Sequence, residues 1–314
     1  MTEIYTDYVA PPEVDHQQVV VSLESTEGRI VLRENRYGHG FSLGANAEGF
    51  GAGSVENELI PRLRARWAML GTQRQTEADM FLPVMVKSTS ATEVRRLVAE
   101  MTRIMKLADG LFKVVVFDPA TGQTRYRDVA YREGLATPQW SSPKSVKYGL
   151  TADYLDPWAY ARDGTTTRIN AAPSQGSAGW VAPFVFPLVS GSLGGSVDGR
   201  VDNAGDRPAP LVVTFAGQVT EPRIRNRATG AVVGVTGSLA WDERITVDAL
   251  HQTVELWRTG DPENRQSVPG RLIRGTRLSK MAAEPGRNSY EFRSQTATDA
   301  FVEISAHSAF SALV

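Results

Sequence analysis

Residues 80–106 read MFLPVMVKSTSATEVRRLVAEMTRIMK, and the expected architecture depends on the change of pattern within them. Met80–Lys87 predicts a strand, in which Pro83 suits a sheet edge or a bulge. After Ser90 or Thr92, either of which can cap a helix, charged residues fill one face. The other face is apolar at helical spacing and consists of Val94, Leu97, Val98, Met101, Ile104 and Met105. We expect a helix over Glu93–Lys106 whose apolar face covers a sheet.

Strand patterns surround this helix in the first half of the chain. A hairpin is expected where two β-rich runs flank Ser25-Thr26-Glu27-Gly28. Further strands are predicted at 62–69, 111–117, 124–132 and 146–155. Between the hairpin and these strands, 37–54 is rich in glycine. Its run Gly49-Phe50-Gly51-Ala52-Gly53 lacks the strand, helix and spacing of a dinucleotide-binding loop, which favours a flexible or tightly turning connection.

The second half predicts short strands at regular spacing and no convincing helix. Turn residues such as Asn203-Ala204-Gly205-Asp206 and Pro285-Gly286-Arg287-Asn288 separate the strands, a pattern typical of a β-sandwich. The predicted fold class is therefore mainly β with one α-helix. The expected domains are 1–170 and 183–314, joined by a Gly/Ser/Pro-rich linker at 171–182.

Composition excludes several classes of function. The 314 residues include no cysteine, which rules out disulfides, zinc–thiolate sites and a cysteine nucleophile. Thirty-four Lys and Arg against 35 Asp and Glu leave no positive excess, which argues against a dedicated nucleic-acid binder. The N-terminal residues do not resemble a signal peptide, and no apolar run is long enough to span a membrane.

The sequence predicts no enzyme, no metal site and no cofactor. The four histidines (His16, His39, His251 and His307) are far apart in the sequence, as expected of surface or cap residues. The spacing of Asp198, Asp202 and Asp206 does not fit a calcium loop and favours turns. Neither Asp153 with Asp156 nor Asp242 with Glu243 is supported as a catalytic carboxylate pair. Tryptophans that could stack on sugars, but fit buried strand positions better, are Trp140, Trp158, Trp180, Trp241 and Trp257.

One candidate interface is a basic run. Arg62, Arg64 and Arg66 share one face of a predicted strand. They fit either a solvated face or a surface that pairs with acidic side chains of a neighbouring copy.

Taken in order, several runs resemble those of the distal tail proteins of long-tailed bacteriophages. The first half of the resemblance consists of Phe81-Leu82-Pro83-Val84, the helix, Leu111-Phe112-Lys113-Val114, and Ala152 to Trp158. In the second half the matching runs are 203–210, 221–226, Thr229-Gly230, 245–248 and 284–292. The resemblance covers about residues 20 to 310, and it rests on the order and spacing of the runs.

The resemblance implies a structural virion protein at the phage tail tip. Its N-terminal domain would form a ring, with six copies joining the tail tube protein to the tip. Its C-terminal domain would be a galectin-like sandwich outside the ring, an attachment platform. Implied partners are other copies, the tail tube, a tail-tip hub with tail-associated lysin or the tape-measure protein, and a receptor-binding protein, with DNA only passing through the lumen.

Two other classes remain open. A carbohydrate-binding module for host glycans would need aromatic side chains facing solvent on one sandwich face. A glycan-cleaving enzyme would need two carboxylates converging in a cleft.

Overall fold

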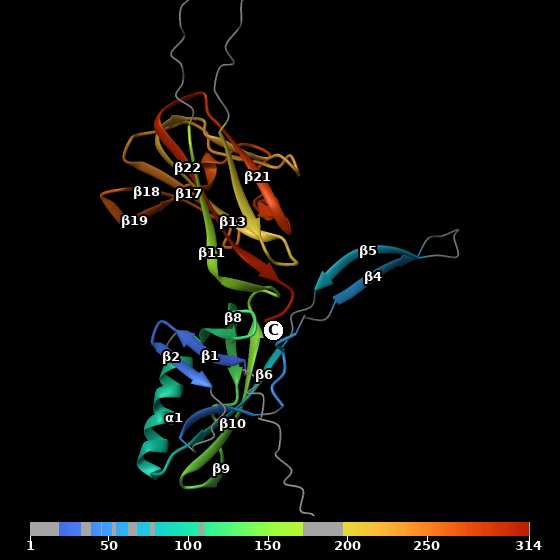
Figure 1. Cartoon of the computed structure of the whole chain (residues 1–314), viewed down its shortest axis with the longest axis vertical. Coiled ribbons are helices and arrows are strands. Elements are labelled where there is room, and N and C mark those ends of the chain that lie inside the picture. Colours follow the sequence, from blue (N-terminus) through green and yellow to red (C-terminus); the bar gives the residue numbers. More distant parts are fainter. Residues whose placement is uncertain are drawn as a thin grey trace, which may run out of the picture. The chain divides into compact units, whose positions relative to one another are not determined.

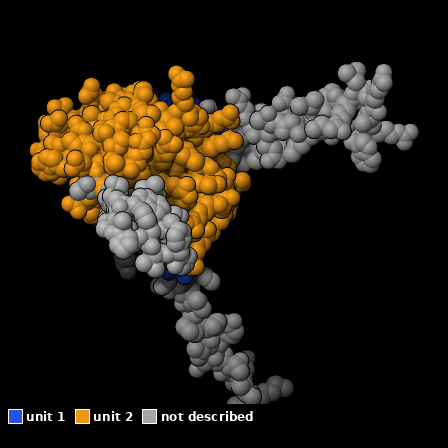
Figure 2. Space-filling model, turned by 90° about the horizontal axis from the view of Figure 1, so that it is seen from above, with its two compact units in different colours: residues 1–157, 312–314 blue, residues 158–311 orange. Residues whose placement is uncertain are grey.

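A computed structural model describes residues 19–32, 39–44, 46–51, 55–61, 68–75, 79–106, 110–171 and 197–313 (Figure 1). Among these residues, it contains one α-helix and is otherwise mostly strands, which confirms the predicted fold class. Two compact units are present, 1–157 with 312–314 and 158–311 (Figure 2). No helix in the described ranges is both long and apolar enough to cross a membrane.

The first unit is an antiparallel sheet covered by the helix α1 (Ala91–Lys106). Its strand order is β2-β1-β7-β8-β10-β6-β3, and β9 pairs with β10. Strands β2 and β3, at the two ends of this order, approach one another. The bounds are β1 (Val20–Ser25), β2 (Gly28–Leu32), β3 (Gly40–Leu43), β6 (Asp79–Lys87), β7 (Leu111–Asp118), β8 (Gln123–Glu133), β9 (Gln139–Ser142) and β10 (Ser145–Tyr154). A separate hairpin pairs β4 (Val55–Pro61) with β5 (Ala68–Gln75).

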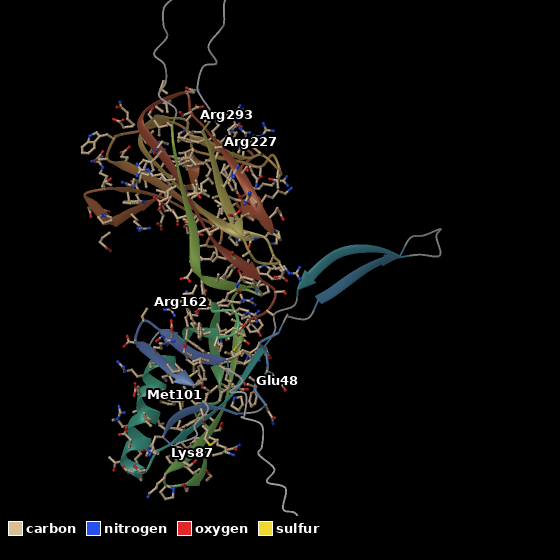
Figure 3. The ribbon with its side chains drawn as sticks, in the orientation of Figure 1. Glu48, Lys87, Met101, Arg162, Arg227 and Arg293 are labelled. Carbon is tan, nitrogen blue, oxygen red and sulfur yellow. The ribbon has the colours of Figure 1, made fainter. Side chains whose placement is uncertain are left out.

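Helix α1 forms as its sequence pattern predicts. Ser90 Oγ accepts a hydrogen bond from the Glu93 amide at 3.2 Å, the N-cap arrangement of a capping box. The side chains of Val94, Met101, Ile104 and Met105 are fully buried (Figure 3 labels Met101). The helix contacts β1, β2, β6, β7 and β10. Its apolar face therefore forms the core of the first unit together with one face of the sheet.

Pro83 lies inside the sheet and not on an edge strand. Strand β6 is flanked by β10 on one side and β3 on the other. The ladder with β3 ends at Leu43 and Val84, Pro83 O accepts the last bond from Gly44 N, and pairing resumes only at Glu48 and Phe81. The missing N–H of proline thus falls where the partner chain leaves the sheet, which excludes the edge interpretation. The ladder with β10 runs through Pro83 without a register shift, so the bulge interpretation is not supported there.

The described part of the glycine-rich stretch, 39–44 and 46–51, lies against the sheet. It contains β3, and Gly49 packs directly on the sheet at φ +91°. Gly49 O accepts hydrogen bonds from the Tyr154 hydroxyl and from Arg127 Nη1, the latter at 3.1 Å. A Cβ on Gly49 would approach Met80 Cα to 2.8 Å. The sequence signalled glycine here because the backbone needs close approach, not mobility.

The second unit contains two antiparallel sheets. One has the order β19-β18-β17-β13-β22-β11, with β16 and β20 also on β13, and the other has β12-β21-β14-β15. Phe215 and Phe292, one from each sheet, meet with ring centroids 6.4 Å apart. The two sheets therefore pack as the predicted sandwich. The bounds are β11 (Ala159–Asn170), β12 (Val197–Asn203), β13 (Ala209–Thr220), β14 (Arg223–Asn226), β15 (Val232–Gly234), β16 (Ser238–Leu239), β17 (Glu243–Asp248), β18 (Thr253–Arg258), β19 (Asp261–Ser267), β20 (Ala282–Ala283), β21 (Gly286–Arg293) and β22 (Thr296–Phe310), with short 3-10 turns at Pro269–Arg271 and Leu278–Lys280.

The division between the units differs from the expected domain limits. Strand β11 pairs along its length with β22, so it groups with the second unit, although the sequence analysis placed it before the linker. Apart from Ala171, the linker expected at 171–182 lies outside the described residues and stays a prediction.

Candidate functional site: exposed surfaces and turn anchors

The basic run proposed from the sequence cannot be placed. Arg62, Arg64 and Arg66 lie outside the described residues, between the end of β4 at Pro61 and the start of β5 at Ala68. The strand predicted over 62–69 therefore overlaps the observed strand β5 only at Ala68 and Met69. The role of these arginines at an interface stays a prediction.

A second candidate surface is the face of the first-unit sheet that α1 does not cover. Along β7, Phe112, Val114 and Val116 are buried. On the alternate face Leu111 and Phe117 are 47% and 38% exposed, whereas Val115 between them is buried. A further apolar side chain, Leu155, follows β10 and is 56% exposed. Together, these exposed apolar side chains are typical of a protein contact surface.

The middle of this surface is polar. Lys113 lies 4.1 Å from the ring centroid of Tyr126 and 3.4 Å from Asp128 Oδ1. Burial, together with the negative charges of Asp128 and Asp156, raises the pKa of Tyr126 to about 12, so the phenol stays neutral at neutral pH. We call Leu111, Lys113, Phe117 and Leu155 the β7 surface. Sequence analysis missed it because its exposed residues alternate with equally apolar buried ones.

An ion-pair cluster joins three strands of the same unit. Arg132 of β8 donates two hydrogen bonds of 2.7 Å to the carboxylate of Asp79 on β6, and its Nε donates one of 3.0 Å to Asp153 on β10. Asp153 is thus held by an arginine and not paired with Asp156 as a catalytic carboxylate would be. The bidentate geometry fixes the relative positions of the three strands.

This cluster predicts a pH dependence of stability. The hydrogen bonds from Arg132 lower the pKa of Asp79 from its usual 3.8. A lowered pKa in the folded state adds stability above pH 3.8 that disappears as the pH falls through the folded-state pKa. We expect Arg132→Gln to be less stable than wild type at pH 7 and the difference to shrink steadily below pH 3.8. Urea unfolding of both proteins from pH 7 to pH 2.5 measures the difference in the free energy of unfolding. A constant difference over this range would contradict the stabilising contact between Arg132 and Asp79.

The sequence runs behind the family resemblance prove to be turn anchors. Asn203 is 1% exposed and donates from Nδ2 to Arg207 O (2.7 Å) and Ala283 O (2.9 Å). Its Oδ1 accepts from Gly205 N (3.0 Å) and Ala309 N (3.3 Å). One buried side chain thus ties together the 203–207 turn, β20 and β22.

Two further buried asparagines, in the other sheet, also hold turns through their side-chain hydrogen bonds. Asn288 donates to Glu284 O at 2.7 Å and accepts from the Glu284 amide at 3.1 Å. Asn226 Oδ1 accepts the Ala228 and Thr229 amides, and its Nδ2 lies 3.3 Å from the Tyr290 hydroxyl. These side chains close turns by replacing missing backbone partners. The motifs therefore identify the fold rather than a reactive site.

The three aspartates considered for calcium each have a separate partner. Asp198 pairs with Arg227 at 2.7 Å, and Asp202 pairs with Arg287 at 3.5 Å. Asp206 accepts from the Ser311 amide at 2.7 Å and from its hydroxyl. Within the described ranges, no group of three or more His, Asp or Glu side chains is arranged to hold a metal ion. The other carboxylate pair, Asp242 with Glu243, is bound to Arg258.

The tryptophans divide into exposed and covered. Trp241 is 80% exposed and Trp140 also faces solvent, contrary to the expectation of buried strand positions. Trp158 and Trp257 lie against arginine guanidiniums, and Trp180 lies outside the described residues. Trp241 stands on a firm turn, because the Ala240 amide donates to Glu243 Oε2 at 3.0 Å and the Thr259 amide donates to Asp242 O at 2.9 Å.

Comparison with known proteins identifies the fold. No family model matches the sequence, and no curated protein matches it. Among solved structures, the Dit protein of phage SPP1, described as a hub of the adsorption apparatus in phages that infect Gram-positive hosts, matches with a TM-score of 0.56 and 13% identity over 92% of this chain and 98% of its own. The phage P2 baseplate in its activated conformation with calcium matches with a TM-score of 0.53 and 12% identity over the same shares. The chain has the fold of these phage hub and baseplate proteins over 92% of its length.

Proposed function

We propose that this chain is a structural protein of a long-tailed bacteriophage, located at the tail tip. The observation that carries the proposal is the fold similarity to a phage hub protein across both units, over 92% of this chain and 98% of the other. A likeness confined to the sandwich would be weak support, because sandwiches serve many functions. Agreement of both units, in the same order along the chain, is more specific evidence for this role than agreement of the sandwich alone.

In this proposal the first unit forms a closed ring, with six copies joining the tail tube to the tip. The β7 surface supplies an apolar contact area, and Lys113 and Asp128 at its centre supply charges of both signs. Such a surface suits contact with a different surface of the next copy, and repetition of that contact closes a ring. Arg62, Arg64 and Arg66 remain a second candidate for the same role.

The second unit then serves as an attachment platform outside the ring. Its proposed partners are the tail-tip hub with tail-associated lysin, the tape-measure protein or a receptor-binding protein. DNA passes through the ring lumen without specific contacts, which a net charge of −1 permits. The proposal assigns no enzymatic activity to either unit.

A carbohydrate-binding function is the alternative, and Trp241 is the observation that favours it. An aromatic ring 80% exposed on a rigid turn is suited to stack on a sugar. Titration of the purified chain with host cell-wall glycans tests this function. Binding that Trp241→Ala abolishes would favour the alternative.

The ring is tested by its mass. Light scattering across micromolar concentrations, with negative-stain images, is expected to reveal a species of about 200 kDa, the mass of six 34.2-kDa chains. Recombinant chain mixed with tail tubes provides the second condition, since a ring that closes only on a tail still appears there. A monomer under both conditions would contradict the proposal.

The interface is tested by charge substitution on the β7 surface. Leu111→Glu combined with Phe117→Glu is expected to reduce assembly at least tenfold, because it buries two carboxylates without partners at the contact. Both side chains are exposed in the monomer, so its thermal midpoint should stay close to wild type. Val232→Glu, an equally exposed apolar position in the second unit, is the matched control and should assemble normally. Normal assembly of the double variant would exclude the β7 surface.

A further inference from the structure

The outer face of the larger sandwich sheet carries a row of alternating arginine and aromatic side chains. Ladder registers place Phe301 opposite Ala216, Ala216 opposite Arg244, and Arg244 opposite Trp257. Next to the row, Phe215 and Ile245 point into the core, so the row lies on the outer face of this sheet. Ala216 and Phe301 are nevertheless buried, at 1% and 9% exposure, in the middle of the row. In order from β11 to β19, the row is Arg168, Phe301, Ala216, Arg244, Trp257 and Arg265. Arg168 is offset within the row, because its ladder partner on β22 is Glu303 and it reaches Phe301 diagonally.

The guanidinium groups lie over the rings. Arg168 is 3.5 Å from the centroid of Phe301, and Arg244 is 5.4 Å from the same centroid. Arg244 reaches Phe301 across β13 because the intervening residue is the small Ala216. Arg244 and Arg265 lie 5.3 Å and 5.6 Å from the centroid of Trp257.

This stacking leaves little aromatic surface for a sugar. Trp257 stands on β18, between the arginine of β17 and the arginine of β19, so guanidiniums flank it from both sides. Its Nε1 also donates to Thr246 Oγ1 at 3.0 Å. Two guanidiniums beside the ring compete with a sugar for the faces of Trp257. A stacked guanidinium keeps its in-plane N–H donors available and suits a carboxylate or phosphate instead.

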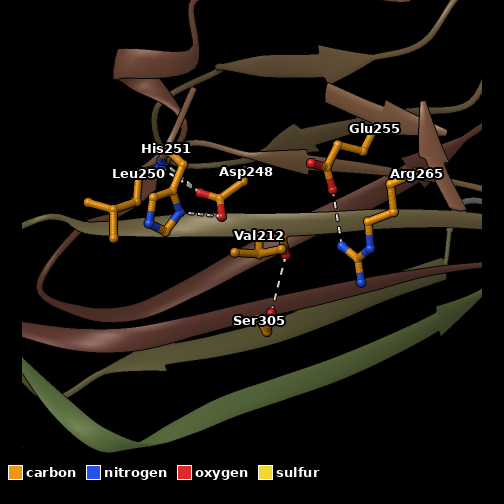
Figure 4. Close-up of polar contacts among 7 residues, drawn as sticks. All are labelled: Val212, Asp248, Leu250, His251, Glu255, Arg265 and Ser305. Carbon is orange, nitrogen blue, oxygen red and sulfur yellow. Dashed lines mark hydrogen bonds and ion pairs between the residues drawn. The ribbon is translucent and has the colours of Figure 1, made fainter. Parts of the chain in front are cut away.

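Two of the three arginines are not neutralised within the described residues. Arg265 pairs with Glu255 at 3.0 Å, as Figure 4 shows beside the Asp248–His251 contact of the same sheet. Arg168 and Arg244 form no ion pair with a described residue, and each uses only Nε, toward Asn170 Oδ1 at 3.3 Å and Thr259 Oγ1 at 3.1 Å. Their terminal N–H groups therefore remain available to a ligand.

We propose that this row is a docking site for an extended, glutamate- or aspartate-rich segment of another protein. The guanidiniums of Arg168 and Arg244 lie 3.5 Å and 5.4 Å from the same Phe301 centroid, so they are at most about 9 Å apart. An extended chain that crosses the strands brings residues i and i+2, about 7 Å apart, over these two guanidiniums. Two carboxylates at that spacing would each accept a bidentate pair of hydrogen bonds. The inference goes beyond the ring and does not rest on it, because one copy carries the whole site.

The test is binding of a synthetic peptide to the full chain. The probe is a fluorescent peptide with Glu at every second position and Gly between, and its Gln counterpart is the uncharged reference. Fluorescence anisotropy at low salt is expected to detect the Glu peptide only. Arg168→Gln with Arg244→Gln should weaken its binding at least about tenfold, since each lost contact is charge-assisted. Arg225→Gln, exposed on β14 of the other sheet, is the matched control and should bind as wild type.

Three outcomes would overturn the proposal. They are equal binding by the double variant, no binding of the Glu peptide at millimolar protein, and binding of polyglycerol phosphate without binding of the peptide. The last outcome would reassign the row to a phosphate polymer. Arg168→Gln alone, a change of one exposed side chain, keeps the test decisive if the double variant proves unstable.

Discussion

Replacing Gly134 with alanine is expected to lower the free energy of unfolding of the first unit by about 3–5 kcal/mol. Gly134 follows β8 at φ +114°, a conformation that side chains rarely adopt. A Cβ there would lie 2.8 Å from the carbonyl carbon of Gly149 and 2.9 Å from Leu150 Cα, and closer still to the Gly149 oxygen. These are backbone atoms of β10, so relief requires the strand to move.

Gly122→Ala is the matched control for this change. Gly122 also has positive φ, at +69°, but a Cβ there meets no atom within 4 Å. It should cost only about 1 kcal/mol, the ordinary cost of a left-handed alanine. Denaturant unfolding of both variants separates the clash from the backbone preference. Equal losses at the two positions would show that β8 and β10 do not approach as described.

Replacing Asn203 with alanine is expected to destabilise the second unit by about 3–5 kcal/mol. The substitution removes four hydrogen bonds from a side chain that is 1% exposed. Ala283 O and the Ala309 amide are then left inside the protein without that partner, which costs more than the bonds themselves contribute. The turn that leads into β13 loses its connection to β20 and β22.

The control for this change is Asn264→Ala. Asn264 lies on β19, whose residues are all exposed, so its loss should change stability by less than about 0.5 kcal/mol. Calorimetry of the full chain distinguishes the two variants by the shift of the transition that belongs to the second unit. An Asn203→Ala protein with the wild-type midpoint would refute the anchor role.

Local sequence signals were sufficient to predict an element when the residues of that element alone determine its structure. Helix α1 shows this, since Ser90, Glu93 and the apolar stripe fix its start and its buried face without reference to any distant residue. The β1–β2 hairpin likewise follows from two apolar runs around one turn. Hydrophobic period and turn chemistry are short-range properties, so they can be interpreted from neighbouring residues alone.

Other assignments failed or were absent because partners distant in sequence decide them. Pro83 was compatible with an edge or a bulge until β3 and β10 were found on either side of β6. Strand β11 was assigned to the first domain, yet β22 holds it in the second unit from more than a hundred positions along the chain. The candidate sites show the same limit. Nothing local in Arg168, Arg244 or Trp257 indicates that they form one row.

The sequence by itself therefore determined the mainly β class, the single helix, and the ordered turn motifs that resemble phage distal tail proteins. Only the tertiary structure showed that Asn203, Asn226 and Asn288 within those motifs are buried anchors. It also decided which apolar residues of β7 face solvent and which arginines align over aromatic rings. The physical reason is that a strand fixes only which residues share a face, whereas the pairing of distant strands decides what each face meets.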